Sequence, residues 1–161
     1  MKRVLCCLLV CFLIFITSAC QPTEKESPST VPQSFSVSES GAKEAKSILL
    51  KNYITGDEIL LGDPAALEEI VRAAEVLNGS NPISSRGYYG GSYGLTFYDT
   101  AEPTANDQPY LVFSLFRANE TDAYLVHGDY EVVDGHMYSA MYPAKMEDVK
   151  ALEMILAKYF E

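Results

Sequence analysis

Between residues 93 and 142, short runs rich in apolar and aromatic residues alternate with turn-forming residues, and this pattern limits the possible folds most strongly. Such runs are typical of β-strands, and Ala118–Thr121 and Asp134-Gly135 between them are typical of hairpin turns. Strands joined by short turns pair antiparallel. The predicted strands are Tyr93–Asp99, Tyr110–Arg117, Asp122–His127, Tyr130–Val133 and His136–Tyr142.

Two amphipathic helices are predicted around these strands. Asp63 is a natural N-cap for the first, Pro64 suits the first helical position, and Gly79 predicts its end. The second helix is expected from about Lys145 to Phe160. Two further short strands, Ser47–Ile54 and Glu58–Leu61, precede the first helix. The expected fold class is α+β, a single antiparallel meander sheet of about five to seven strands with both helices on one face.

Alternation within the strands predicts that the two faces of the sheet differ in composition. One face would be aliphatic and pack under the helices, and Met137 and Met141 are assigned to it. The other would be rich in tyrosine and would include Tyr138 and Tyr142. Tyrosine is common in ordinary sheets because it forms good cross-strand pairs. Tyrosine also provides a large contact area at protein interfaces. The tyrosine-rich face is therefore either an ordinary sheet surface or a surface that binds a partner.

A loop rich in glycine, serine and tyrosine, residues 80–92, separates the first helix from the strands. Its composition is typical of binding loops, although a flexible connection is an alternative. Together with the tyrosine-rich face it gives the candidate ligand- or partner-binding residues. These are Arg86, Tyr88, Tyr89, Tyr93, Tyr98, Tyr110, Tyr124 and Tyr138.

The only two histidines lie in two tripeptides that mirror each other, His127-Gly128-Asp129 and Asp134-Gly135-His136. If residues 130–133 form a short strand between two turns, His127, Asp129, Asp134 and His136 could approach one another and bind zinc or another divalent metal. The alternative is turn chemistry, since tight turns require Asp and Gly. Nothing in the sequence suggests a Ser–His–Asp triad, so nucleophilic catalysis is not predicted.

The first 20 residues form a leader. Basic Lys2 and Arg3 precede a continuous apolar run, Val4–Ile16, which is shorter than the about 20 residues that a transmembrane helix needs. Small residues then lead to Cys20. This arrangement resembles a bacterial lipoprotein signal peptide. The resemblance implies cleavage before Cys20, a diacylglyceryl group on its thiol, and anchoring on the extracytoplasmic face of the bacterial membrane. An ordinary secretory signal, cut near Ala19, is the alternative.

The positions of the cysteines and the net charge limit the kinds of site and partner that the domain can have. All four cysteines lie within the first 20 residues, so the rest of the chain has no disulfide and no cysteine metal site. The formal charge is −10, and loss of Lys2 and Arg3 with the leader makes it more negative. Such acidity argues against nucleic acid as a partner. It also means that the lipid would have to attach the protein to an anionic membrane.

These observations divide the chain into a signal peptide (1–19), a lipidated Cys20 with a disordered linker (20–45) and a globular domain (46–161). We expect a membrane-anchored lipoprotein whose domain binds an envelope protein, a peptide or a glycan without catalysing a reaction. No cofactor is expected. The alternative is a metal-binding protein or a metal-dependent hydrolase that uses the two histidines and their neighbouring aspartates.

Overall fold

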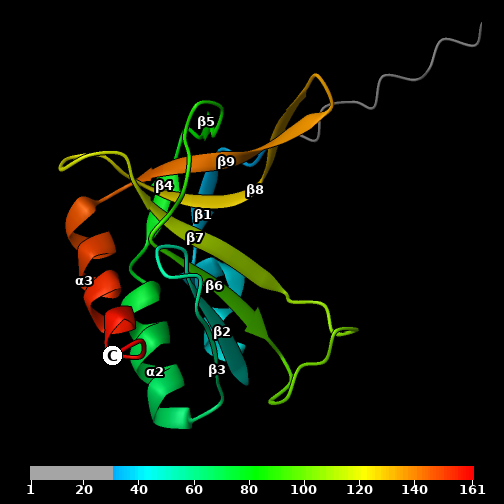
Figure 1. Ribbon diagram of the computed structural model, residues 1–161, viewed down its shortest axis with the longest axis vertical. Helices are drawn as coiled ribbons and strands as arrows, with labels where there is room; N and C mark the ends of the chain where they lie inside the picture. The colour runs from blue at the N-terminus through cyan, green and yellow to red at the C-terminus, as the bar shows by residue number, and fades with distance from the viewer. Residues whose placement is uncertain (1–30) are drawn as a thin grey trace, which may run out of the picture.

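The computed structural model describes residues 31–161, so the leader, Cys20 and residues 21–30 of the predicted linker lie outside the described residues. Its main element is an antiparallel sheet with the strand order β3-β2-β6-β7-β8-β9-β5 (Figure 1). With the two helices described below, this sheet confirms the predicted α+β class. The strands are β2 (Ser47–Asn52), β3 (Glu58–Leu61), β5 (Ile83–Ser84), β6 (Tyr93–Tyr98), β7 (Leu111–Arg117), β8 (Ala123–Val133) and β9 (His136–Ala144).

Helices α2 (Pro64–Ala74) and α3 (Met146–Ala157) lie side by side against one face of the sheet (Figure 1). Helix α2 begins where the sequence predicts, because the Asp63 carboxylate accepts a hydrogen bond from the backbone N–H of Ala66 at 3.0 Å. Each helix buries an apolar stripe against the sheet. The stripes are Leu67, Ile70 and Ala74 in α2, and Val149, Leu152 and Leu156 in α3.

The hydrophobic core fills the space between the helices and the sheet. Its strand residues alternate along each strand as predicted, so every second side chain points toward the helices. The fully buried members on the sheet side include Ile48, Leu50, Leu95, Phe97, Phe113, Leu115 and Leu125. The face predicted to pack under the helices is therefore the one that they cover, and it includes the aromatic residues Phe97 and Phe113.

Strand β9 has the opposite orientation to the one expected. Tyr142 pairs with Leu125 and lies fully buried in the core, where its hydroxyl donates to the carbonyl of Pro32 at 3.1 Å. Met141 instead pairs with Val126 and Ile83 and is buried on the other side of the sheet. The expected faces of Tyr142 and Met141 were wrong because both residue types are compatible with either face, and alternation fixes only relative orientation.

Residues 34–45, which we call the strap, belong to the folded domain and not to a linker. They comprise β1 (Ser34–Ser36) and two single-turn 3-10 helices, η1 (Ser38–Ser40) and η2 (Ala42–Glu44). Strand β1 pairs with β4 (Asn78–Ser80) as a separate two-stranded sheet. The ring of Phe35 lies 5.7 Å from that of Tyr142 and 6.1 Å from that of Phe113. The strap therefore completes the layer that covers the core.

Gly79 does not end helix α2 but allows β4 to approach the main sheet. A Cβ atom at this position would lie 2.6 Å from the carbonyl oxygen of Pro143 and 2.7 Å from the Cβ of Tyr142. Only glycine permits a contact this close between two backbones. The helix ends earlier than expected, at Ala74, and the chain then enters β4.

The predicted strands 122–127 and 130–133 are one strand, β8, interrupted by an irregularity in its pairing with β9. The register shifts between Val126 and Asp129, and Gly128 adopts a positive φ of 69° there. Such a bulge bends a strand without ending it. The hairpin formed by β8 and β9 extends beyond the body of the domain (Figure 1).

The two edge strands of the main sheet are short. Strand β3 has four residues and β5 has two. Within residues 31–161, no helix has the length and apolarity that crossing a membrane would require.

Candidate binding surface

The face of the main sheet opposite the helices, which we call the open face, carries aromatic and apolar side chains that are partly or largely exposed. Its members are the residues that alternate with the core positions and that the strand register places next to one another. They are Leu49, Lys51, Glu58, Leu60, Thr96, Tyr98, Val112, Ser114, Phe116, Tyr124 and Val126.

Tyr53 lies across the middle of the open face. Its hydroxyl is 3.2 Å from the hydroxyl of Ser114, and its side chain is 44 % exposed. The ring occupies the space above Gly94, where a Cβ atom would come within 2.8 Å of the Tyr53 hydroxyl oxygen. Because Gly94 has no side chain, the Tyr53 ring can lie directly on the backbone of the sheet, with its other side in contact with solvent.

A second aromatic group forms where the 80–92 loop folds back onto the open face. Tyr88 contacts Phe116 edge to face, with the ring centroids 5.7 Å apart, and its centroid is 6.1 Å from that of Tyr124. Phe116 is buried by this contact. Burial raises the pKa of Tyr124, and the neighbouring Tyr88 and Asp122 raise it further. The sequence predicted both tyrosines as binding residues, and the structure brings them together.

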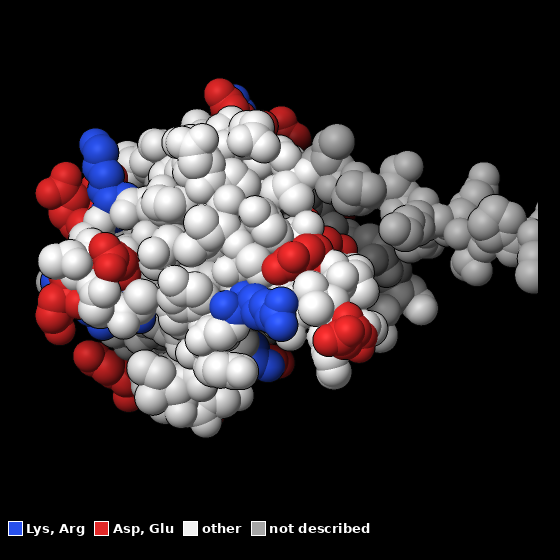
Figure 2. Space-filling view, turned by 90° about the horizontal axis from the view of Figure 1, so that it is seen from above, with Lys and Arg blue, Asp and Glu red and all other residues white. Residues whose placement is uncertain are grey.

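The open face is poor in charge. Its only charged members are Lys51 and Glu58, which form an ion pair with each other at 2.7 Å. This pair neutralises itself, whereas the whole chain carries a formal charge of −10. The view onto the β5 and β9 end of the molecule likewise shows a broad uncharged area with most of the acidic side chains toward its margins (Figure 2). Charge depletion of this kind is typical of the centre of an interface.

The base of the loop is fixed to both sides of the sheet through Ser92. The carbonyl of Ser92 accepts from the backbone N–H of Tyr53 at 3.1 Å. The hydroxyl of Ser92 donates to the carboxylate of Glu153 on α3, which also pairs with Arg117 at 3.0 Å. These bonds hold the start of β6 while the tip of the loop projects outward. Arg86 and Tyr89 are exposed near this tip, and Tyr89 is 90 % exposed.

Three of the predicted binding tyrosines lie elsewhere. Tyr93 is on the helix side, with its ring 5.8 Å from that of Phe160, and burial followed by Glu153 raises its pKa. The Tyr110 hydroxyl donates to the carbonyl of Gly41 at 3.3 Å and so holds the strap. Tyr138 is half-buried opposite Glu131 in the outer part of the β8–β9 hairpin. Tyr98, in contrast, lies on the open face as expected.

The four predicted metal ligands do not converge. His127 stacks on Phe35 with centroids 4.2 Å apart, and its Nδ1 is 2.7 Å from the carbonyl oxygen of Val112. Asp134 occupies the turn of the hairpin, with a positive φ of 51°, and His136 follows that turn. Among residues 31–161 no three His, Cys, Asp or Glu side chains form a group that could hold a metal ion. Turn and bulge geometry therefore explains the mirrored pattern.

The chain matches no protein-family model, and it matches no curated protein and no solved structure.

Proposed function

We propose that this protein is a lipid-anchored binding protein on the extracytoplasmic face of a bacterial membrane, and that it binds its partner through the open face. The observation that carries the proposal is an uncovered sheet face that is rich in tyrosine and poor in charge, on a chain that is otherwise acidic. The partner belongs to the envelope and is a protein, a peptide or a glycan.

The surface chemistry of the open face supports a binding role. Exposed apolar side chains scattered singly are ordinary, but contiguous exposed patches often mark interaction sites. Here Tyr53, Leu60 and Val112 are each substantially exposed and belong to the same face. Tyrosine gives a large contact area at a small cost in conformational entropy. Because the face carries no net charge, it avoids the repulsion that the rest of this acidic chain would exert on an anionic partner.

The residues of the leader support the proposed attachment to a bacterial membrane. A basic start, a short apolar run and small residues before Cys20 resemble the signal of a bacterial lipoprotein. A diacylglyceryl group supplies two acyl chains, and stable anchoring requires about two such membrane-binding signals. The domain would then meet partners at the membrane surface.

A charge placed at the centre of the open face tests the proposal. Val112 is 44 % exposed, so Val112→Glu should leave the folded state intact. In a complex the same carboxylate would be buried without a partner, so we expect the affinity to fall about tenfold or more. The measurement is capture of envelope proteins and glycans by the immobilised protein, followed by titration of the captured species.

Met154→Glu is the matched control because it places the same charge at an exposed apolar site on α3, which is 73 % exposed. We expect Met154→Glu to bind as the unchanged protein does. If the two variants bind the captured species equally well, the open face is not the binding surface. Thermal unfolding of both variants checks that neither change acts through loss of folding.

A further inference from the structure

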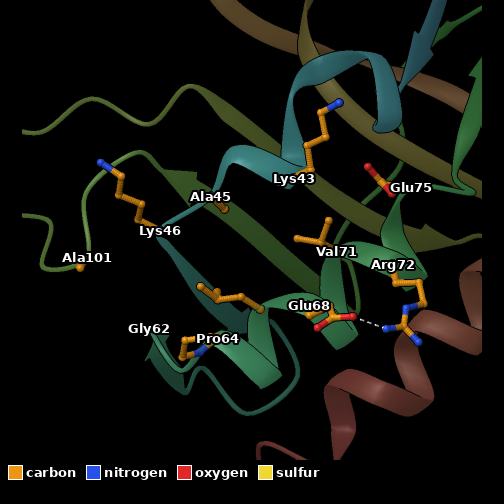
Figure 3. A pocket seen from close by; sticks show the side chains of 11 residues that line it. Lys43, Ala45, Lys46, Gly62, Pro64, Glu68, Val71, Arg72, Glu75 and Ala101 are labelled. Atoms are coloured by element: carbon orange, nitrogen blue, oxygen red, sulfur yellow. Dashed lines mark hydrogen bonds and ion pairs between the residues drawn. The ribbon is translucent and has the colours of Figure 1, made fainter.

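A groove lies on the other side of the molecule, between the strap and helix α2. Its volume is about 610 Å³, which falls within the size range of small-molecule sites. Ala45, Leu67 and Val71 form an apolar floor. Gly62 and Ala101 lie at one end of the groove (Figure 3). No part of the open face contributes to this groove, so it is a separate site.

The groove has an uneven distribution of charge. Lys43 and Lys46 line its strap side, and neither forms an ion pair with a residue in the described part of the chain. On the α2 side, Arg72 pairs with Glu68. Glu75 also lines the groove near the end of α2. The strap side is therefore the positive side of the groove in a protein whose formal charge is −10.

Lys43 in the strap and Lys46 just after it both extend away from the apolar floor, and their ammonium groups point away from each other toward opposite ends of the groove (Figure 3). An apolar floor favours a hydrocarbon chain, because burial of apolar surface contributes about 25 cal/mol per Å². Ammonium groups beside the groove favour an anionic head group, through charge-assisted hydrogen bonds that are stronger than neutral ones. A cationic head group would be repelled by the same lysines.

We propose that this groove binds an amphiphile with one hydrocarbon chain and a carboxylate head group, a class that includes the free fatty acids. The chain lies along Ala45, Leu67 and Val71, and the carboxylate lies at the strap side, where the flexible side chains of Lys43 and Lys46 supply the positive charge. This site is independent of the partner that we propose for the open face.

Binding of dansyl-labelled undecanoate tests the inference, because dansyl emission rises when the probe leaves water. We expect saturable binding of one probe per protein, displaced by unlabelled dodecanoate. The double change Lys43→Glu and Lys46→Glu should weaken binding by about tenfold or more, since each tenfold step in affinity corresponds to about 1.4 kcal/mol. Val71→Asp, which places a carboxylate on the floor, should abolish binding.

Lys145→Glu with Lys150→Glu is the matched control, because it changes the net charge equally at residues that do not line the groove. We expect it to leave probe affinity unchanged, as should Val112→Glu on the open face. Dodecanol should displace the probe at least tenfold less well than dodecanoate. The proposal is overturned if both double variants bind alike, or if the alcohol competes as well as the acid.

Discussion

Replacing Phe35 by alanine should lower the free energy of unfolding by about 3 kcal/mol, in the range typical of buried phenylalanine. The side chain is only 7 % exposed, and it packs against the rings of Phe113, His127 and Tyr142. Removal leaves a cavity where the strap crosses the core, and the surrounding rings cannot close it fully. Urea unfolding, followed by far-ultraviolet circular dichroism, measures the change in midpoint at constant slope.

The same measurement on Tyr89→Ala supplies the comparison, because it also removes an aromatic ring but from a side chain that is 90 % exposed. We expect a change within about 0.5 kcal/mol, as for most surface substitutions. An equally small effect of Phe35→Ala would mean that residues 34–45 are not part of the folded domain. That result would support the prediction from composition that these residues form a disordered linker.

Replacing Cys20 by serine should remove the protein from the membrane fraction altogether. A hydroxyl cannot receive the diacylglyceryl group through a thioether bond, and the acidic chain has no electrostatic attraction to anionic lipid. The measurement combines metabolic labelling with radioactive palmitate and separation of membranes from soluble material. We expect the unchanged protein to be labelled and membrane-bound, and Cys20→Ser to be unlabelled.

Cys11→Ser is the matched control, since it makes the same chemical change within the apolar run of the leader. It should leave labelling and membrane association unchanged. If Cys20→Ser is labelled or sediments with membranes to the same extent as the unchanged protein, Cys20 is not the anchor. The ordinary secretory signal would then account for the leader.

Local signals in the sequence predicted the elements whose cause is local. Asp63 and Pro64 placed the start of α2 correctly, because capping depends on neighbouring residues only. Alternation along β6 and β7 likewise identified the core-facing side chains, since one face of each strand is consistently apolar. These two patterns sufficed for the α+β class and for one side of the core.

Features that depend on contacts distant in sequence were missed. The strap contributes three buried residues, Phe35, Val37 and Ala42, within a polar segment, and its partners in β4, β8 and β9 lie far along the chain. Tyr53 was not predicted as a binding residue because its position on the open face depends on Gly94, which belongs to another strand. The groove between η2 and α2 likewise depends on how the strap packs. No spacing of residue types in the sequence marks these arrangements.

The short edge strands of the main sheet affect the tendency of this protein to aggregate. Strand edges present unpaired backbone groups that can template another chain and start aggregation. Here β5 offers only two residues and β3 only four, one of them the charged Glu58. Both ends of the sheet are therefore poor templates. Copies of the domain that meet edge to edge therefore have little free strand edge through which to join into a shared sheet.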